Sequence, residues 1–327
     1  MIISKTPYRI SLLGGGTDYP SWYKLNGGQV ISFTINKYIY ISIRDLPPFF
    51  KHKLRLVYSK IENVTNVDKL IHPTAKEILK LFKIKKGLEI HYDGDLPAHS
   101  GLGSSSAFTV GLLNALNEYF NIKMSKKELA EKAIYIEQEF VKDLVGSQDQ
   151  INTSFGGLNH IKFFKSGNFK VNNILLNKQS IQKLENNFML FFTGISRFSS
   201  KITKTYIKKL SNNDNLYHIN QVVNEGLSII KKGDFNQLGE LLDFYWDQKK
   251  KLSKDISNPY IDKIYKKAKN AGAIGGKITG AGGGGFILFY VPENKQNDVR
   301  NALNKLLYVP FKIEYKGSRI IFNDLKN

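Results

Sequence analysis

Runs of β-branched and aromatic residues, broken by turn residues, recur through the first half of the chain, and each run predicts a β-strand. The predicted strands are Met1–Arg9, Val30–Ile43, Leu54–Tyr58, Leu88–Tyr92 before a turn at Asp93-Gly94, and two strands within Leu158–Leu176 joined at Ser166-Gly167. This half therefore mixes strands with a few helices.

Three helices are predicted between these strands. Apolar residues recur at helical spacing in Val67–Phe82 and in Ser104–Phe120. The third helix opens at a capping-box pattern, Ser125 with Glu128. Its expected inner face consists of Leu129, Ala133, Ile136 and Phe140.

The chain turns polar at Ile181–Asn187, and we place the boundary between two domains there, at 1–184 and 185–327. Beyond it, strands are expected at Phe188–Thr193, Phe286–Val291, Phe311–Tyr315 and Arg319–Phe322. Helices are expected at Ser199–Leu210, Asn215–Lys231, Asp234–Leu252, Pro259–Ala271 and Asn294–Leu307. This mixture predicts an α+β protein in two layers.

Composition narrows the function classes. The chain has 327 residues, enough for two domains, and no cysteine, which excludes disulfides, Cys-ligated zinc and thiol nucleophiles. No apolar run approaches the roughly 20 residues of a membrane span, and the start lacks a signal-peptide pattern. We therefore expect a cytoplasmic protein with no membrane partner.

The net charge of +20, from 48 Lys+Arg against 28 Asp+Glu, is typical of nucleic-acid-binding proteins. However, only six of these residues are arginine, the side chain best suited to reading guanine, and the lysines are scattered. We therefore expect a solvated basic surface and no nucleic-acid partner.

The segment Pro97–Ala107, with the sequence PAHSGLGSSSA, directly precedes a predicted helix. Its glycines allow the backbone to approach a ligand closely, and its serines supply hydroxyl groups and a helix cap. A helix start offers unpaired N–H groups and a partial positive charge. The segment therefore predicts a phosphate-binding loop.

A second glycine-rich segment spans Gly272–Gly285. Gly280, Gly282 and Gly285 match G-x-G-x-x-G, but a helix is expected before them and a strand after them, the reverse of a dinucleotide-binding loop. Ile278 stands where a Walker loop has Ser or Thr. Because ordering so many glycines costs entropy, we expect a phosphate or a sugar to lie against this backbone.

Four charged residues complete the candidate chemistry. Arg9 on the first strand leads into Gly14-Gly-Gly-Thr-Asp18, a glycine turn that presents a carboxylate. Glu137 and Asp149 flank a break at Gly146-Ser147, so one carboxylate is placed to hold Mg²⁺ and the other to face a substrate hydroxyl. No histidine pair at ligand spacing predicts a transition-metal site.

Taken together and in this order, the three segments resemble the signature motifs of the GHMP kinases (galactokinase, homoserine kinase, mevalonate kinase, phosphomevalonate kinase) over nearly the whole chain. Gly14-Gly-Gly-Thr-Asp18 departs from the galactokinase form Gly-Glu-His-Thr-Asp and is similar to sugar kinases that act on D-glycero-D-manno-heptose 7-phosphate. Thr193-Gly-Ile-Ser-Arg197 and Val145-Gly-Ser-Gln-Asp149-Gln150 resemble the same subgroup. The implied fold is an amino-terminal domain like ribosomal protein S5 domain 2 and a ferredoxin-like carboxy-terminal domain.

The resemblance also implies residue roles. Asp149 would be the catalytic aspartate, as a base or as an orienting group, with Arg9 as its electrostatic partner. Ser104 and Glu137 would be the Mg²⁺ ligands. ATP would be bound by the middle motif: Ser100, Gly101, Leu102, Gly103, Ser104, Ser105 and Ser106. The sugar would be bound by Gly15, Gly16, Thr17, Asp18, Arg197, Lys277, Gly280, Gly282 and Gly283.

The implied reaction is transfer of the ATP γ-phosphoryl group to the anomeric hydroxyl of the heptose phosphate, giving heptose 1,7-bisphosphate. The phosphate of such a substrate needs a cation, for which Arg197 is the first candidate, followed by Lys249 and Lys277. Two alternatives stay open: a GHMP kinase for a free sugar such as fucose or galactose, and a non-catalytic nucleic-acid binder. The phosphorylated sugar is the expected partner, with a homodimer as a further expectation.

Overall fold

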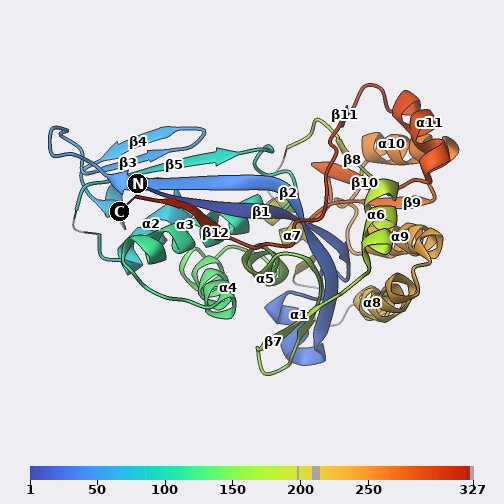
Figure 1. Ribbon diagram of the computed structural model, residues 1–327. Coiled ribbons are helices and arrows are strands. Elements are labelled where there is room, and N and C mark those ends of the chain that lie inside the picture. Colours follow the sequence, from blue (N-terminus) through green and yellow to red (C-terminus); the bar gives the residue numbers. More distant parts are fainter. Residues whose placement is uncertain (85, 197–198, 208–213, 325–327) are drawn as a thin grey trace.

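In the computed structural model, which describes residues 1–84, 86–196, 199–207 and 214–324, the chain forms two β-sheets with helices packed against each (Figure 1). The first sheet occupies one end of the molecule and the second sheet the other. The long strands β1 (Ile2–Leu13) and β2 (Gly28–Asp45) run from the first region toward the second.

The first sheet has the strand order β12-β1-β2-β5-β3-β4, with β6 and β7 added beside β2. Its other strands are β3 (Leu54–Val57), β4 (Ile61–Val64), β5 (Leu88–Gly94), β6 (Leu158–Phe163), β7 (Phe169–Asn173) and β12 (Arg319–Asn323). The two halves of β2 have different partners on the side away from β1: Phe33 pairs with Leu158 of β6, and Ile43 pairs with Ile90 of β5. Strand β2 therefore organises this sheet.

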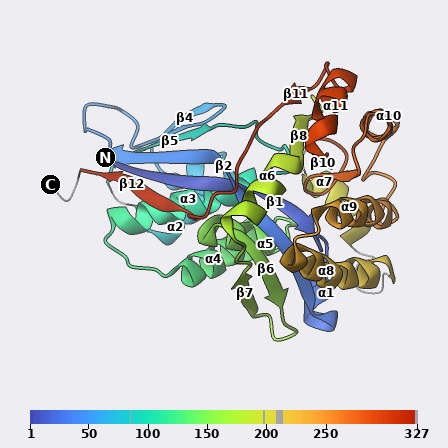
Figure 2. The same ribbon diagram turned by 45° about the vertical axis from the view of Figure 1, so that its right-hand side comes forward.

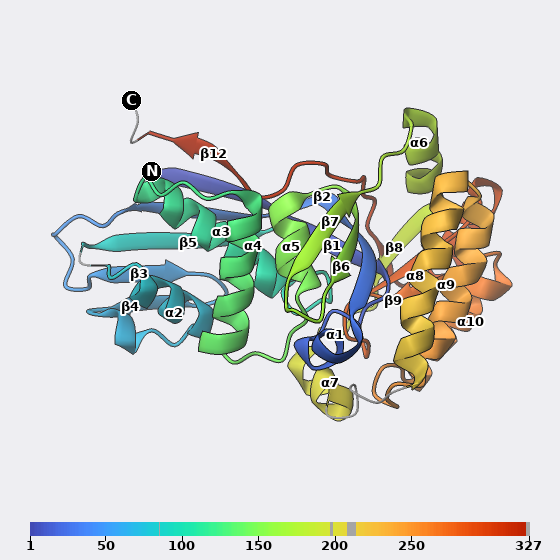
Figure 3. The same ribbon diagram turned by 90° about the horizontal axis from the view of Figure 1, so that it is seen from below.

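Helices α2 (Pro73–Leu81), α3 (Ser104–Tyr119), α4 (Lys126–Tyr135) and α5 (Gln148–Phe155) cover one face of this sheet (Figure 3). Helix α3 packs directly on β1 and β2 and has α2, α4 and α5 on its other sides. This position explains why α3 is buried around most of its circumference, with Gly111 against side chains of the sheet.

The second sheet has the order β11-β8-β10-β9, from β8 (Phe188–Phe192), β9 (Gly275–Ile278), β10 (Phe286–Tyr290) and β11 (Leu307–Tyr308). The helices of this region are α6 (Lys178–Asn187), α7 (Ser199–Tyr206), α8 (Asp214–Lys232), α9 (Phe235–Lys250), α10 (Pro259–Asn270) and α11 (Gln296–Ala302). Helices α8 and α9 lie side by side; α8 contacts β1 and β2, and α9 contacts β9 (Figure 2). This helix pair thus joins the two sheets.

The end of the chain returns to the first sheet, where β12 pairs antiparallel with β1. Ile2 pairs with Asn323, and the amino terminus forms an ion pair with Asp324. The expected domain boundary at residue 184 falls within α6 and remains a prediction. The structure adds that Arg319–Asn323, as strand β12, belong spatially to the first sheet.

Most of the predicted elements are present. The strand at Val30–Ile43, the helix at Ser104–Phe120, the capping box of Ser125 with Glu128, and the helices at Asn215–Lys231 and Asp234–Leu252 are confirmed within a few residues. Each has either a long periodic pattern or an explicit cap. The α+β class is confirmed as well.

Several local predictions are wrong. The helix predicted at Val67–Phe82 is a short 3₁₀ turn, Val67–Lys69, followed by α2, because the residue before Pro73 is disfavoured in a helix. The strand predicted at Phe311–Tyr315 is reduced to a single bridge between Ile313 and Ile35. The helix predicted at Asn294–Leu307 ends at Ala302, and Leu307 pairs with Phe192 instead.

The segment before the second glycine-rich loop is also corrected. Strand β9 occupies Gly275–Ile278, where the sequence suggested loop, so the glycines connect two antiparallel strands. Glycine is disfavoured in strands, and this composition hid β9. Helices α1 (Pro20–Asn26) and α6 and strand β4 were not anticipated, because each is short and mostly polar or lacks a periodic pattern.

The helix that starts at Lys126 ends in a π-helical turn, Ile136–Phe140. The extra residue in a π turn rotates the following side chains relative to an α-helix, so Phe140 leaves the expected inner face and is 39% exposed. The same turn contains Glu137, which is buried. Among the described helices, none has the length and apolar character required to cross a membrane.

Candidate active site

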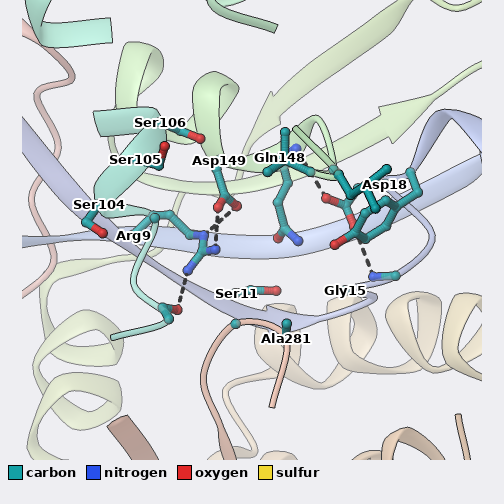
Figure 4. Close-up of a pocket in the computed structure, with 18 of the residues that line it drawn as sticks. Arg9, Ser11, Gly15, Asp18, Ser104, Ser105, Ser106, Gln148, Asp149 and Ala281 are labelled. Atoms are coloured by element: carbon teal, nitrogen blue, oxygen red, sulfur yellow. Dashed lines mark hydrogen bonds and ion pairs between the residues drawn. The ribbon is translucent and has the colours of Figure 1, made fainter. Parts of the chain in front are cut away.

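A pocket lies where the two halves of the molecule meet (Figure 4). Its wall comes from β1 and the loop after it, from the start of α3 and the loop before it, and from the start of α5 and the loop before it. The end of α9 and the loop between β9 and β10 complete the wall. The polar side chains that line it include Arg9, Ser11, Asp18, Gln148, Asp149 and Lys249. Most of the predicted site residues are therefore brought together from distant parts of the chain.

An ion pair of Arg9 and Asp149 lies at the middle of the pocket. The Arg9 Nε donates to Asp149 Oδ1 at 2.6 Å, and Nη2 donates to Oδ2 at 2.5 Å. The third nitrogen, Nη1, donates to the Gly101 carbonyl at 2.7 Å. Because a two-point contact fixes both groups, Arg9 orients the Asp149 carboxylate and holds the phosphate-loop candidate at once. The Asp149 side chain is 21% exposed and faces the pocket.

The loop before α3 has the backbone conformation that an anion site requires. Gly101 and Gly103 have φ of 83° and 76°, and Gly103 is the N-cap of α3 with no side-chain cap bond. The first N–H groups of this sixteen-residue helix are therefore available to an anion. Gly101, Gly103 and the three serines at 104–106 line the pocket.

Two residues of this motif that were expected to contact ATP, Ser100 and Leu102, do not line the pocket. Ser100 is fully buried and its hydroxyl donates to the Pro97 carbonyl at 2.7 Å, so it shapes the turn. Leu102 is fully buried and belongs to the hydrophobic core. Neither lines the pocket, because alternate residues of an irregular loop face opposite sides.

Glu137 lies behind the serines at the start of α3. Its carboxylate accepts hydrogen bonds from Ser106 at 2.9 Å, from Gln150 at 2.6 Å and from Thr109 at 2.5 Å. All three donors are neutral, and no lysine or arginine of the described residues forms an ion pair with it. Burial therefore raises the pKa of Glu137 to about 7, with Asp149 adding to the effect.

This environment fits a cation. A buried carboxylate that has only neutral partners is the group that a divalent ion would stabilise, and Mg²⁺ prefers hard oxygen ligands. Ser104 lines the pocket as expected, but the serine in contact with Glu137 is Ser106. The described residues contain no cluster of three His, Asp or Glu that would hold a metal alone, which agrees with an ion that arrives with phosphates.

Asp18 stands at the opposite end of the pocket and is almost fully buried. Its Oδ1 accepts from the Gly16 N–H at 2.9 Å, and its Oδ2 accepts from the Gln148 N–H at 3.4 Å. Burial, followed by the nearby Asp149 charge, raises the pKa of Asp18. A Cβ at position 146 would overlap the Asp18 carboxylate, so the Gly146 break gives this side chain its place.

The glycine turn that carries Asp18 divides into pocket wall and support. Gly15 and Gly16 line the pocket, and Gly16 has φ of 114°. Thr17 does not line it, contrary to expectation: its buried hydroxyl donates to the carbonyls of Gly14 and Gln29 at 2.9 and 2.8 Å. Thr17 therefore closes the turn, since its hydroxyl is already used by the backbone.

The loop between β9 and β10 packs mainly against other backbone. A Cβ at Gly280 would lie 2.7 Å from the Gly101 Cα, and one at Gly282 would lie 2.7 Å from the Ile256 carbonyl. The Gly283 N–H donates to that same carbonyl at 2.7 Å. Gly280 and Ala281 of this loop line the pocket, whereas Gly282 and Gly283 do not, and a sugar contact at these two glycines stays a prediction.

The two lysines expected as phosphate partners differ sharply. Lys277 is fully buried and outside the pocket wall; its Nζ donates to the Ser11 and Leu12 carbonyls at 2.6 and 3.2 Å and lies over the Tyr245 ring. It joins β9 to β1, and burial lowers its pKa well below the ordinary value. Lys249 lines the pocket, with its Nζ donating to the Gly280 carbonyl at 2.6 Å. Arg197 lies outside the described residues.

Sequence reasoning missed four polar members of the wall: Ser11, Tyr19, His99 and Gln148. Ser11 follows Arg9 by two positions, which places both side chains on the same face of β1. Gln148 directly precedes Asp149 at the start of α5. Because side chains alternate between the two faces of a strand, the position of Ser11 could have been predicted from that of Arg9. For Gln148 the sequence carries no such signal, because the direction of a side chain at a helix start depends on the fold.

Chemically, the pocket combines an anion-binding helix start, an oriented carboxylate and a polar end with a second carboxylate. Phosphoryl transfer requires little more than positioning and charge stabilisation, and these groups supply both. The arrangement suits transfer of a phosphoryl group from a nucleotide near α3 to an acceptor between Asp149 and Asp18.

Comparison with known proteins agrees with this chemistry. The family model of the GHMP kinases N terminal domain matches residues 69–157, and that of the GHMP kinases C terminal matches residues 227–309. A D-glycero-alpha-D-manno-heptose 7-phosphate kinase from Campylobacter jejuni is 31% identical over 316 residues, covering 93% of each chain. A galactokinase from Thermotoga neapolitana is 26% identical over 343 residues, covering 95% of each chain.

Among solved structures, one described as "a D-glycero-D-manno-heptose 1-phosphate kinase from Bacteriodes thetaiotaomicron" is similar over 99% of both chains, with a TM-score of 0.80 and 25% identity. The resemblance inferred from the three motifs is thereby confirmed, and so is the two-domain fold that it implied. This protein belongs to the GHMP kinase family, and it is an ATP-dependent kinase.

Proposed function

We propose that this kinase is a sugar kinase that transfers the γ-phosphoryl group of ATP to the anomeric hydroxyl of D-glycero-D-manno-heptose 7-phosphate. The observation that carries the proposal is the position of the Arg9–Asp149 ion pair, between the open start of α3 and the polar end at Asp18. The similarity to a protein named as a heptose 7-phosphate kinase supports the choice of acceptor.

In the proposed reaction, the anomeric oxygen forms a bond to the γ-phosphorus while the bond from that phosphorus to the bridging oxygen breaks, and ADP leaves. Asp149 accepts the hydroxyl proton, and Arg9 keeps the carboxylate oriented toward the acceptor. The N–H groups at the start of α3 hold the transferred phosphate. Mg²⁺, held by Glu137 with serine hydroxyls at the start of α3, would neutralise phosphate charge.

The phosphate on the acceptor needs a cation at the pocket. Among the described residues, Lys249 has that position, since Lys277 is buried behind the wall. We assign the acceptor phosphate to Lys249, with Arg197 as the second cation. Lys249→Met is therefore expected to raise the KM for the phosphorylated sugar about tenfold or more and to leave the KM for ATP nearly unchanged. The exposed Lys266→Met is the matched control.

The deciding experiment measures ADP release with ATP and Mg²⁺ over a panel of heptose 7-phosphate, free heptose, galactose and fucose. The proposal predicts by far the highest kcat/KM for heptose 7-phosphate and a product with a new phosphate at the anomeric carbon, seen by phosphorus NMR. Preference for a free sugar would instead assign a galactokinase- or fucokinase-like activity, which the similarity to galactokinases keeps as the second candidate.

The product of the proposed reaction, a heptose 1,7-bisphosphate, would serve the synthesis of nucleotide-activated heptose for lipopolysaccharide or capsule. Because the reaction consumes ATP, we place it in the cytoplasm. A homodimer also remains a prediction, which light scattering on the purified protein tests.

A further inference from the structure

Two buried polar atoms at the Asp18 end of the pocket have no hydrogen-bond partner among the described residues: the Ser11 hydroxyl and the Gln148 Oε1. Ser11 is 2% exposed and Gln148 is 6% exposed, yet both line the pocket. A buried polar atom without a partner costs stability, and such atoms usually pair with a group that the protein binds.

The two side chains converge on the same space. Gln148 extends from the start of α5 between Asp149 and Asp18 and points toward Ser11 on β1 (Figure 4). A Cβ at Gly15 would lie 3.0 Å from the Ser11 Oγ, 3.4 Å from the Tyr245 hydroxyl and 3.6 Å from the Gln148 Nε2. Gly15 itself lines the pocket, and the nearest neighbours of its missing side chain are therefore polar atoms of three different elements.

The charge of this space selects the kind of ligand. Asp18 and Asp149 both lie beside Gln148, so a phosphate or a carboxylate placed there would be repelled. A serine hydroxyl and a side-chain amide can each donate and accept a hydrogen bond, as a sugar hydroxyl does. The chemistry therefore fits neutral hydroxyl groups.

From these observations we propose that Gln148 and Ser11 bind hydroxyl groups of the acceptor above Gly15 and thereby determine which sugar the enzyme accepts. The inference rests on the proposed function, because it assumes that the acceptor is a sugar. Binding of the hydroxyls supplies the partners that the two side chains lack, so an acceptor without a hydroxyl at this place leaves them unpaired. A site built in this way rejects the deoxy analogue strongly.

The test uses the full-length enzyme and three variants. Gln148→Leu and Ser11→Ala remove the two groups, and Ser154→Ala is the matched control, because Ser154 also has a buried hydroxyl without a partner, lies on α5, and does not line the pocket. We expect Gln148→Leu to raise the sugar KM at least tenfold and Ser11→Ala to raise it about threefold. The KM for ATP should change less than twofold, and Ser154→Ala should change neither constant.

Deoxy analogues of the accepted sugar separate direct contact from a merely structural effect. In the wild type, removal of the hydroxyl that Gln148 binds should raise the KM by the same factor as Gln148→Leu, and the variant should show no further loss with that analogue. Full additivity for every deoxy analogue would overturn the inference, as would unchanged sugar KM values in both variants. The wild-type analogue series decides the matter even if one variant fails to fold.

The outcome also separates this inference from the proposed function. A wild type that phosphorylates no sugar contradicts both, whereas an active wild type whose variants keep their sugar KM contradicts the inference alone.

Discussion

The two ends of the pocket offer a ligand different kinds of groups: one end offers mainly backbone groups, and the other offers side chains. At the end formed by α3, the available groups are backbone N–H groups of a helix start and serine hydroxyls, with Glu137 buried behind them. At the end formed by the turn after β1, they are the side chains Asp18, Gln148 and Ser11. The Arg9–Asp149 ion pair lies between the two.

This difference suggests how one pocket can combine general recognition of a phosphate chain with selective recognition of a sugar. Backbone groups recognise a phosphate chain without regard to side-chain identity, as long as glycine allows the required φ. Side chains read the arrangement of hydroxyls, and a single substitution changes what they accept. We therefore expect changes at the α3 end to affect ATP and Mg²⁺, and changes at the other end to affect the sugar.

The largest effect is expected between the two ends. Asp149→Asn removes the proposed proton acceptor and should lower kcat by about 10²–10⁴, with a much smaller change in the KM for ATP. Steady-state kinetics with ADP detection measures both. Asp68→Asn, at an exposed side chain, is the control and should retain wild-type activity. A near-normal kcat for Asp149→Asn would remove Asp149 from the mechanism.

At the α3 end, Glu137→Gln tests the proposed metal contact. The amide keeps much of the hydrogen bonding but loses the charge, so the Mg²⁺ concentration for half-maximal activity should rise about 10–100-fold. The KM for the sugar should stay within twofold. An unchanged Mg²⁺ requirement would show that the ion is held by the nucleotide and other residues.

Gly280→Ala tests whether the β9–β10 loop supports the α3 end through packing. The alanine Cβ would lie 2.7 Å from the Gly101 Cα, and residue 280 has φ of 66°. We therefore expect a loss of about 1–3 kcal/mol in the free energy of unfolding and a several-fold higher KM for ATP. Gly167→Ala is the matched control, with φ of 90° but no atom within 4 Å. Urea unfolding and ATP titration compare the two; equal losses would assign the effect to φ alone.

At the sugar end, Asp18→Asn should separate stability from function. Because the pKa of Asp18 is raised in the folded state, the folded protein holds this proton more tightly than the unfolded chain does. The free energy of unfolding therefore falls as the pH rises from the ordinary pKa of aspartate through the raised pKa of Asp18. The asparagine variant lacks this loss, so its melting temperature should exceed that of the wild type at neutral pH and converge with it in acid.

The same variant should bind the sugar more weakly, with a KM about tenfold higher and little change for ATP. Thermal unfolding from pH 4 to 8 and steady-state kinetics give the two readouts. A variant that is less stable at neutral pH would show that the Asp18 charge supports the turn more than burial opposes it.

Part of the site was predictable because its signals are local. Gly101 and Gly103 indicate a loop with positive φ, and the helix after them has a periodic pattern. Both features are confirmed, and the phosphate site that they predict can be stated before the fold is known. The order of the three glycine-rich motifs also carried the family resemblance. For the same reason, capped or long periodic elements such as α3 and β2 were predicted well.

The errors occurred where distant contacts override local pattern. Phe140 follows helical spacing but leaves the core, because the π turn rotates it. Strand β9 consists partly of glycine and exists because β10 pairs with it. Lys277 resembles a phosphate partner in the sequence, yet the fold places its ammonium on the carbonyls of β1.

The sequence by itself therefore determined the class of chemistry: a glycine–serine turn at a helix start, acidic groups and an arginine on a strand, each a short-range feature of the backbone or of one motif. Only the tertiary structure decided which of these groups meet. It set Arg9 against Asp149 across 140 positions and buried Glu137 behind Ser106. It also left the Ser11 hydroxyl and the Gln148 Oε1, near Gly15, with no hydrogen-bond partner among the described residues. The physical reason is that side-chain partners are chosen by packing between elements far apart in the chain, and no local pattern records that packing.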